Sequence, residues 1–272
     1  MTLLVALLAA AAVIFFLTHP CLDRRRTRRW RGENFAHRGL HDAERGVVEN
    51  TLNAFRAARD AGYGIELDVQ LSADRTLVVF HDDDLRRLCG DPRRVNQVPL
   101  EELRALPLKG AEGDPEARIP TFRAALEAVG GRVPLLIELK NGKNNRLLCQ
   151  GVTDALRDYP GEYIVESFNP LIVAWFRFHA PQVVRGQLVG PMRSYIPIVN
   201  QIGAFCMAEM LVNFAGRPDF VAYDANARRF FSPHFQRGIY HTPLAAWTVR
   251  DDALLRLVKS RGEICIFERV RP

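Results

Sequence analysis

The stretch ELDVQLSADRTLVVFHD, residues 66–82, joins two apolar runs that both have the composition of β-strands. The runs Gly64–Val69 and Leu77–Phe80 stand too close together for a helix, although parallel neighbouring strands need a connection of about a dozen residues or more. Local departures from a regular pattern are expected near functional sites. The stretch therefore marks both an irregular connection and a candidate functional region.

On both sides of this stretch, apolar runs alternate with segments of helical spacing. Nine runs have strand character: Asn34–His37, Gly64–Val69, Leu77–Phe80, Pro134–Leu139, Tyr163–Ser167, Val184–Leu188, Phe220–Tyr223, Leu244–Val249 and Ile264–Phe267. The segments 50–62, 121–131 and 250–263 place apolar residues three or four apart between a capping residue and a glycine. Strand–helix alternation over roughly 240 residues predicts an α/β fold, a (β/α)8 TIM barrel, and favours it over a doubly wound sheet. Nine runs for eight positions mean that at least one run is peripheral or miscounted.

The segment from about Asp83 to Arg118 interrupts the alternation. It is polar and contains proline and glycine, so we expect an insertion over about 83–118, after the third strand. In a TIM barrel that loop lies on the catalytic face, where it can form part of a lid.

Charge and cysteine content narrow the class of protein. The formal net charge of the 272 residues is +6, but six arginines and one aspartate lie within residues 1–32, so the rest of the chain is nearly neutral. A nearly neutral body argues against a nucleic-acid partner. The five cysteines are scattered and form no CxxC pair, which argues against a disulfide framework or a zinc site and fits a reducing compartment.

The N-terminal run TLLVALLAAAAVIFFL, residues 2–17, is uncharged and apolar. A bilayer core requires about 20 apolar residues, so we expect a single transmembrane helix over residues 1–22. A basic juxtamembrane linker over 23–33 and the barrel over 34–272 would follow. Because the arginines come after the run, the positive-inside rule places the barrel in the cytoplasm, on a single-pass protein of the cell membrane. A cleaved signal peptide is the alternative, although it would carry its positive charge before the run.

Acidic side chains close two of the predicted strands. Glu66 and Asp68 are two residues apart and point the same way from a strand, and Glu138 ends a later strand. The carboxyl ends of barrel strands meet on one face, where active sites are built. Three carboxylates form an oxygen-only set suited to Mg²⁺ or Ca²⁺. Solvated strand ends, or an ion pair with Lys140, are the alternative interpretation.

Histidines close two other runs. His37 and His81 are candidates for an acid/base pair because imidazole titrates closest to neutral pH. A single histidine after a strand is more often structural, but two beside a carboxylate set favour catalysis. Arg38, next to His37, is suited to bidentate binding of a phosphate.

The ordered motifs resemble those of the glycerophosphodiester phosphodiesterases, which are metal-dependent (β/α)8-barrel hydrolases. The resemblance covers almost everything after residue 33. The matching motifs are HRG (37–39), ENT (49–51), ELDVQLSADRTLVVFHDDDLRRLCG (66–90), IPTFRAAL (119–126), LLIELK (135–140), ESFNP (166–170) and AWTV (246–249). VENT replaces the usual PENT. The ending GEICIFERVRP differs from the common pattern and resembles a membrane-anchored bacterial branch.

The resemblance implies roles for nine residues. His37 and His81 match the acid/base histidines, and Glu66, Asp68 and Glu138 match the ligands of the divalent cation. Arg38 and Lys140 match phosphate-binding residues, and Glu49 matches an acidic residue of the site. Trp247 matches an aromatic residue lining the pocket, although a core tryptophan is an equal alternative.

The implied reaction is hydrolysis of glycerophosphodiesters to glycerol 3-phosphate and an alcohol. Lysophospholipase D-type cleavage of membrane lysophospholipids is the second expectation, because the expected N-terminal helix would hold the barrel at a membrane. A non-catalytic phosphate-binding barrel and a metal-dependent sugar isomerase are rivals, but neither accounts for this set of motifs in this order. Nothing in the sequence identifies a protein partner.

Overall fold

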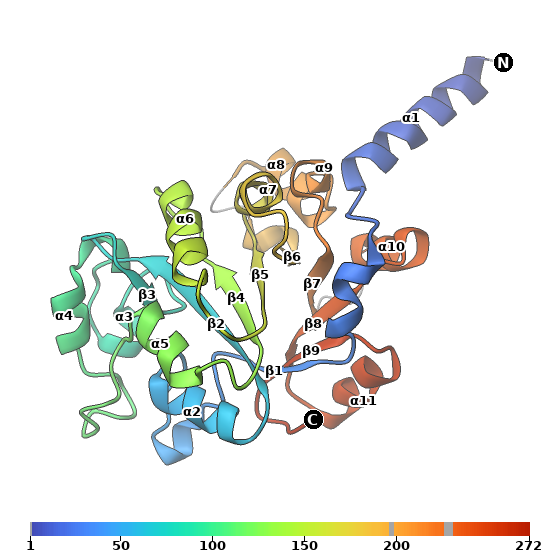
Figure 1. Ribbon diagram of the computed structural model, residues 1–272. Coiled ribbons are helices and arrows are strands. Elements are labelled where there is room, and N and C mark those ends of the chain that lie inside the picture. Colours follow the sequence, from blue (N-terminus) through green and yellow to red (C-terminus); the bar gives the residue numbers. More distant parts are fainter. Residues whose placement is uncertain (1, 196–198, 226–230) are drawn as a thin grey trace.

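A computed structural model of the protein describes residues 2–195, 199–225 and 231–272. At its centre, eight parallel strands form a closed barrel (Figure 1). In chain order they are β1 (Asn34–Ala36), β2 (Gly64–Leu71), β4 (Leu135–Leu139), β5 (Tyr163–Ser167), β6 (Arg185–Val189), β7 (Phe220–Asp224), β8 (Leu244–Val249) and β9 (Ile264–Phe267). Strand β1 pairs with β2 on one side and with β9 on the other, which closes the barrel. The predicted TIM barrel is confirmed.

The remaining strand, β3 (Leu77–Val79), lies outside the barrel. It pairs antiparallel with the end of β2, where Val79 lies opposite Val69. The turn between them is closed by a hydrogen bond from Ser72 N to Thr76 O of 3.0 Å. So short a turn can return the chain only antiparallel. The assignment of Leu77–Phe80 as the third barrel strand is therefore wrong, and β3 is the peripheral run among the nine.

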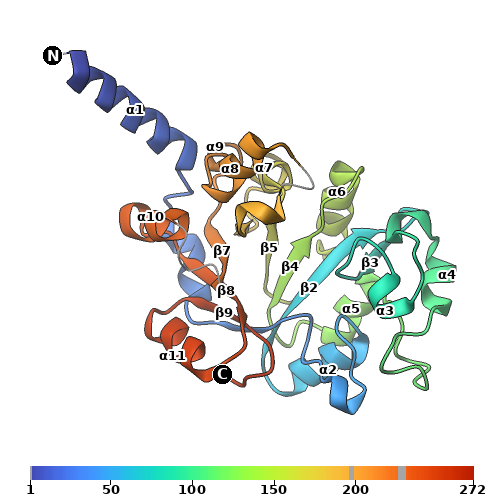
Figure 2. The same cartoon turned by 180° about the vertical axis from the view of Figure 1, so that it is seen from behind.

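Helices follow the strands and surround the barrel (Figures 1 and 2). The longer ones are α2 (Leu52–Asp60), α5 (Phe122–Val129), α6 (Asn145–Ala155), α7 (Pro170–His179), α10 (Phe231–Tyr240) and α11 (Asp252–Ser260). Three short helices lie between β6 and β7: η4 (Met192–Ser194), α8 (Gln201–Ala208) and α9 (Asn213–Gly216). Helices α2 and α5 begin where threonine hydroxyls accept backbone hydrogen bonds, at Thr51 and Thr121.

The alternation of side chains along the strands separates an outer core from the barrel interior. In β2, Ile65, Leu67 and Val69 are fully buried in the core beneath the helices, so Glu66 and Asp68 face the interior. A separate apolar cluster fills the interior; its members include Phe35, Leu136, Ile164, Phe220 and Ile266. The strand pattern thus brings carboxylates into an otherwise apolar barrel.

The segment between β3 and α5 folds as a small packed unit. It contains α3 (Arg86–Cys89), η3 (Val95–Gln97) and α4 (Leu100–Ala105). Its apolar side chains form a cluster of their own, including Val78, Phe80, Leu85, Val95, Val98, Leu103 and Leu108. The unit lies beside the barrel on the side away from the N-terminal helix (Figures 1 and 2).

The N-terminal helix α1 (Thr2–Thr18) projects from the body of the molecule (Figure 1). It is 17 residues long, about 25 Å at 1.5 Å per residue, against a hydrocarbon core of about 30 Å. Among the described residues, no helix has both the length and the apolar character needed to cross a membrane. The predicted transmembrane helix over 1–22 is not found, because α1 ends at Thr18, shortly before Pro20, which cannot donate a backbone hydrogen bond.

The basic segment that follows packs against the barrel. It forms the 3₁₀ helix η1 (Arg24–Trp30), in which Trp30 is buried. Arg26 Nε donates to Asp219 Oδ1 at 2.7 Å, and Arg29 Nη2 donates to Glu162 Oε2 at 2.7 Å. These contacts attach the segment to the body along its length.

Candidate active site

Acidic side chains of three neighbouring strands meet inside the barrel. In the strand register, Asp68 of β2 lies beside Glu138 of β4, and Glu138 lies beside Glu166 of β5. One carboxylate oxygen from each of Glu66, Asp68 and Glu138 lies within 4.8 Å of the others, and all three residues are buried. Parallel strands in register thus gather carboxylates that are far apart in the sequence.

The electrostatics of this cluster are those of a cation site. Burial, with repulsion from Asp68 and Glu138, raises the pKa of Glu66 well above its ordinary value. Asp68 Oδ1 is buried and accepts no hydrogen bond from the described part of the chain, and the Lys140 ammonium, 3.3 Å from it, offsets part of its charge. Buried oxygens without a donor are costly unless a cation or a proton compensates them. The oxygen-only set of Glu66, Asp68 and Glu138 therefore fits Mg²⁺ or Ca²⁺, as predicted.

Two basic side chains, Arg38 and Lys140, adjoin the carboxylates. Lys140 Nζ lies 2.9 Å from Glu138 Oε1 and 3.3 Å from Asp68 Oδ1. Arg38 Nε lies 3.7 Å from Asp68 Oδ2, and the Arg38 backbone N–H donates to Glu66 Oε2 at 2.8 Å. Although burial disfavours the Asp68 anion, the positive charges of Lys140, His81 and Arg38 hold the pKa of Asp68 below its ordinary value. The ion pair of Lys140 with the cluster, offered as the alternative to a cation site, is thus present beside it.

The turn after β1 directs His37 and Arg38 into the site. Arg38 has a φ of 56°, a left-handed conformation that is uncommon for residues other than glycine and clusters at functional sites. The following Gly39, at φ 80°, packs so closely on α2 that a Cβ there would lie 2.9 Å from the Ala54 carbonyl carbon. A glycine is therefore required where β1 turns toward the cavity.

His37 is held by a residue from the end of the barrel. Its Nδ1 lies 3.1 Å from Glu268 Oε2, directly after β9, and Arg250 Nη2 donates to the same oxygen at 3.0 Å. Burial lowers the pKa of His37 to about 4, even though the hydrogen bond to Glu268 raises it. His37 is therefore neutral at neutral pH. With its proton on Nδ1 and donated to Glu268, its Nε2 carries the lone pair that a general base needs.

His81 is reached through the β2–β3 hairpin. Phe80 N donates to Asp68 O at 3.0 Å, which ties the end of β3 to the cluster. His81 Nδ1 lies 2.7 Å from Asp82 Oδ1, and its side chain is 32% exposed. The second histidine is thus positioned by a carboxylate, as the first is, although its strand is not part of the barrel.

Glu49 connects the turn that carries Arg38 to the segment that carries His81. It accepts hydrogen bonds from Arg38 Nη1 at 2.7 Å and from Arg87 Nη2 at 2.6 Å. Arg87, at the start of the packed unit, also donates from Nε to Asp82 Oδ2 at 2.6 Å. The chain Arg38–Glu49–Arg87–Asp82–His81 therefore links the turn after β1 to the second histidine.

These residues surround a cavity of about 270 Å³. Of the nine predicted residues, six line it: His37, Arg38, Glu66, His81, Glu138 and Trp247. The other three adjoin members of this set: Glu49 and Asp68 lie beside Arg38, and Lys140 lies beside Glu138. The Trp247 ring meets that of Phe168 edge-on at 5.8 Å, so the tryptophan belongs to the cavity wall as well as to the core.

Four further residues of the site were not singled out from the sequence. Glu166 lines the cavity, and Asn50 Nδ2 donates to Asp68 Oδ2 at 2.8 Å. Glu268 contacts His37, and Arg87 contacts Asp82, the partner of His81, as described above. Glu166, Asn50 and Arg87 stand inside the motifs ESFNP, ENT and ELDVQL…LCG, where spacing alone did not separate them from their neighbours. Glu268 directly follows β9, as Lys140 directly follows β4, which is a signal that could have identified it.

Fold and site together define an enzyme of the (β/α)8-barrel class, with a carboxylate cluster fitted to a divalent cation between two histidines. The chain belongs to the Glycerophosphoryl diester phosphodiesterase family, whose sequence profile matches residues 37–268.

The chain is similar to named members of this family. It is 36% identical over 163 residues to the glycerophosphodiester phosphodiesterase of Caldanaerobacter subterraneus, a match that covers 56% of this chain and 65% of the relative. It is 29% identical over 162 residues to the lysophospholipase D GDPD1 of Rattus norvegicus, covering 54% of this chain and 48% of the relative. The chain thus spans less than two thirds of the length of either protein.

The fold is similar to that of a phosphodiesterase from Oleispira antarctica, whose structure is a complex with the product sn-glycerol-3-phosphate. The TM-score is 0.68 at 23% identity, and the match covers 86% of this chain and 92% of that one. At this identity the similarity shows the fold. None of the matches supports assignment to a membrane-anchored branch.

Proposed function

We propose that the protein hydrolyses glycerophosphodiesters to glycerol 3-phosphate and an alcohol with the help of a divalent cation. The observation that carries this proposal is the cluster that Glu66, Asp68 and Glu138 form with Arg38 and Lys140 at the cavity. Negative charges suit a cation, and the buried positive charges suit the phosphate that it would bind. Family membership and the product named for the Oleispira structure support the same reaction.

The residues divide the chemistry between them. A divalent cation at the carboxylates would act as a Lewis acid on a phosphodiester oxygen. Arg38 and Lys140 orient the phosphate and offset the charge that develops on it. His37, neutral at its lowered pKa, takes the proton from the glycerol 2-hydroxyl or from water as a P–O bond forms. His81 donates a proton to the alcohol oxygen as its bond to phosphorus breaks, so the leaving group departs as a neutral alcohol. When the 2-hydroxyl is the nucleophile, this step leaves a cyclic phosphate. Water then attacks its phosphorus and gives a proton to His81, and His37 returns a proton to the 2-oxygen as its bond to phosphorus breaks, which yields glycerol 3-phosphate.

Purified protein incubated with glycerophosphocholine should release choline and glycerol 3-phosphate when Mg²⁺ or Ca²⁺ is present. EDTA should stop the release, and an excess of the cation should restore it, because the carboxylates alone repel the phosphate. Choline and glycerol 3-phosphate are measured separately. Release of choline with a product other than glycerol 3-phosphate would contradict the proposal. Undiminished release of choline in EDTA would also contradict it.

Lysophospholipase D-type cleavage is the second candidate, and a specific cavity favours it. An apolar cavity of about 500 Å³ adjoins the site and shares Glu138 and Phe168 with its wall. Tyr195, Val199 and Met207 line its far part. An acyl chain is a chemically suitable occupant, because apolar walls favour burial of hydrocarbon. The similarity to the rat lysophospholipase D supports this candidate.

Filling this cavity separates the two candidates. Met207→Trp should lower kcat/KM for lysophosphatidylcholine about tenfold or more, since overpacking costs about 1–3 kcal/mol. The same variant should leave kcat/KM for glycerophosphocholine nearly unchanged. Choline release from both substrates is the measurement. Equal effects on the two substrates would argue that the cavity takes no acyl chain, and Ile202→Trp, on the exposed side of the same helix, is the matched control.

We further propose that the enzyme works in the cytoplasm next to a membrane. All five cysteines are free, which supports a reducing compartment. The exposed apolar helix α1 supports contact with a membrane without spanning it.

A further inference from the structure

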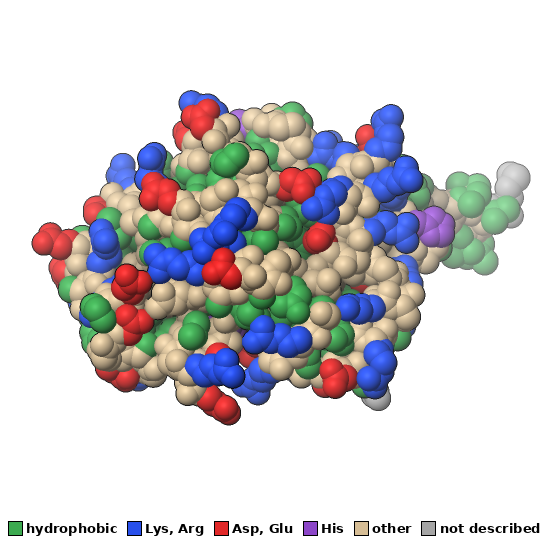
Figure 3. Space-filling view, turned by 60° about the horizontal axis from the view of Figure 1, so that its bottom comes forward, with side chains coloured by type: hydrophobic (Ala, Val, Ile, Leu, Met, Phe, Trp, Pro, Cys, Tyr) green, Lys and Arg blue, Asp and Glu red, His purple; other side chains and the backbone are tan. Residues whose placement is uncertain are grey.

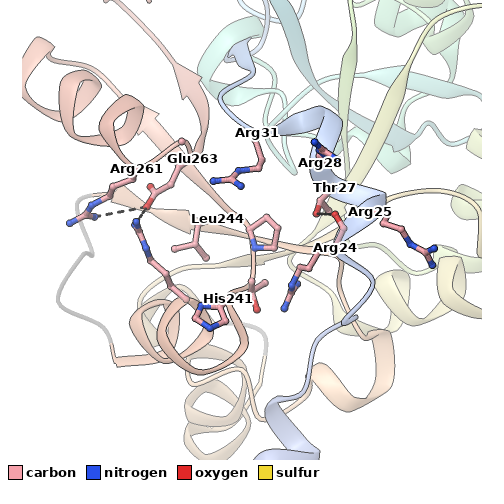
Figure 4. A pocket seen from close by; sticks show the side chains of 13 residues that line it. Arg24, Arg25, Thr27, Arg28, Arg31, His241, Leu244, Arg261 and Glu263 are labelled. Carbon is pink, nitrogen blue, oxygen red and sulfur yellow. Dashed lines mark hydrogen bonds and ion pairs between the residues drawn. The ribbon is translucent and has the colours of Figure 1, made fainter.

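A group of six arginines lies away from the active site. A pocket of about 660 Å³ opens between η1, α10 and the residues that precede β8 and β9 (Figure 4). Its wall contains Arg24, Arg25, Arg28, Arg31, Arg237, Arg261 and His241, with Glu263 as its acidic member. Because β8 and β9 begin here, the pocket lies at the opposite end of the barrel from the catalytic cavity. The proposed reaction therefore does not use it.

Most of this positive charge is not neutralised within the protein. Arg237 Nη1 lies 2.5 Å from Glu263 Oε1, and Arg261 Nη1 lies 4.0 Å from the same oxygen, so two arginines share one carboxylate. Arg28 and Arg31 form no ion pair or side-chain hydrogen bond with any described residue. An anion entering the pocket would thus meet guanidinium groups that still have donors to offer.

The pocket is also shaped by buried contacts. Arg24 donates from Nη1 to Cys21 O at 3.1 Å and from Nη2 to Tyr240 O, so carbonyls hold its guanidinium in place, and no carboxylate of the described residues is paired with it. Arg31, directly after η1, points across the pocket toward Glu263 (Figure 4), and its Nη2 lies 3.6 Å from the Cβ position that Gly262 lacks. Arg24 at the start of η1 and Arg31 directly after it therefore border the same pocket.

The C-terminal end of the apolar helix α1 lies at the rim of this pocket. Tyr240, which accepts from Arg24, donates from its hydroxyl to Phe15 O at 3.0 Å, and His241 of the pocket follows it in the chain. Beyond this root the helix is uncovered: Leu4 and Leu8 are each 62% exposed. Figure 3 shows arginine and lysine side chains around the base of the green, apolar helix. An apolar projection beside a group of positive charges matches the layers of an anionic lipid surface.

We propose that the pocket between η1 and α10 binds the phosphate headgroup of an anionic phospholipid while α1 inserts into the apolar layer of the same leaflet. The pocket supplies the charge selectivity, and the helix supplies apolar contact that no described part of the chain covers. A free phosphate would explain the arginines but not the exposed helix beside them. The inference does not depend on which phosphodiester the barrel hydrolyses.

Co-sedimentation with vesicles tests the proposal on the full chain. Wild-type protein should bind vesicles of phosphatidylcholine with phosphatidylglycerol more tightly than vesicles of phosphatidylcholine alone, and salt should weaken the binding. Arg28→Glu/Arg31→Glu should weaken binding to the anionic vesicles roughly tenfold or more, given the contribution of each basic residue near such a surface. The matched control is Arg104→Glu/Arg123→Glu, two exposed arginines on α4 and α5, which should bind as wild type does.

The outcomes are separable. Leu4→Glu/Leu8→Glu should lose binding to both vesicle types, while thermal unfolding and glycerophosphocholine hydrolysis stay as in wild type, since these residues pack on nothing. Equal binding of the Arg28/Arg31 variant and wild type to anionic vesicles would overturn the headgroup site. Binding of inorganic phosphate at these arginines by titration calorimetry, without vesicle binding, would overturn the lipid assignment.

Discussion

Glu66→Gln should lower the rate of glycerophosphodiester hydrolysis about a thousandfold, since the Lewis-acid contribution of a bound cation amounts to several kcal/mol. Glutamine keeps the shape of the side chain and an oxygen that can accept from the Arg38 N–H, now at 2.8 Å from Glu66. It removes a negative charge that the cation needs. The measurement is the initial rate as a function of Mg²⁺ or Ca²⁺ concentration.

The same variant should behave unusually in thermal unfolding. In the metal-free protein, burial and the charges of Asp68 and Glu138 raise the pKa of Glu66, so its ionised form opposes folding. Glu66→Gln should therefore unfold at the same or a higher temperature without cation. Added cation should raise the unfolding temperature of wild type and leave that of the variant unchanged. Glu127→Gln, on the exposed face of α5, is the control, and a wild-type response of the Glu66 variant to cation would remove Glu66 from the ligand set.

His37→Ala should lower kcat about 10²- to 10⁴-fold, the usual contribution of a general acid or base. The cavity around His37 is polar, and we expect the variant to remain folded. Circular dichroism checks the fold, and His179→Ala, at an exposed histidine on α7, controls for loss of an imidazole. Wild-type turnover by a folded His37→Ala protein would refute the proposed base.

The pH dependence identifies the role of His37 more sharply. Burial lowers its pKa to about 4, so the acid limb of kcat/KM should lie well below the ordinary histidine value of about 6.5. Glu268→Gln should move that limb to still lower pH, because the hydrogen bond to Glu268 raises the pKa of His37. The lowered pKa of His37 also makes the folded protein less stable as the pH falls, as a lowered pKa of a carboxylic acid does. The unfolded chain binds this proton below about pH 6.5, so the contribution of neutral His37 is complete above that pH and is lost as pH falls toward 4.

The nine predicted residues illustrate how far strand ends can be read from a sequence. Glu66 and Glu138 were placed together because each ends an apolar run, and parallel strands bring such ends to one face. The same reasoning placed His81 at the end of a barrel strand, which is wrong, since β3 is antiparallel and outside the barrel. His81 still reaches the cavity, because the hairpin is short enough to return it to the end of β2.

In the N-terminal segment, the sequence pattern did not predict the bounds of the helix. Its composition indicated a membrane-spanning helix of residues 1–22, but composition does not set where a helix ends. The structure ends α1 at Thr18, whose hydroxyl donates to Ile14 O at 2.7 Å and contacts the Tyr240 hydroxyl at 2.8 Å. The last turn of α1 therefore contacts the body of the protein. The arginines that follow pack on the body as η1.

The sequence by itself determined the barrel, the carboxylate pair at Glu66 and Asp68, and the candidate histidines, because side-chain periodicity and residue order are local properties of the chain. The tertiary structure alone decided that Glu268 supports His37, that Arg87 bonds to Glu49, and that the arginines of residues 24–31 meet Arg237 and Arg261 in one pocket. These partners are distant in the sequence. The contact of His37 with Glu268 depends on the closure of the barrel, which brings β9 beside β1.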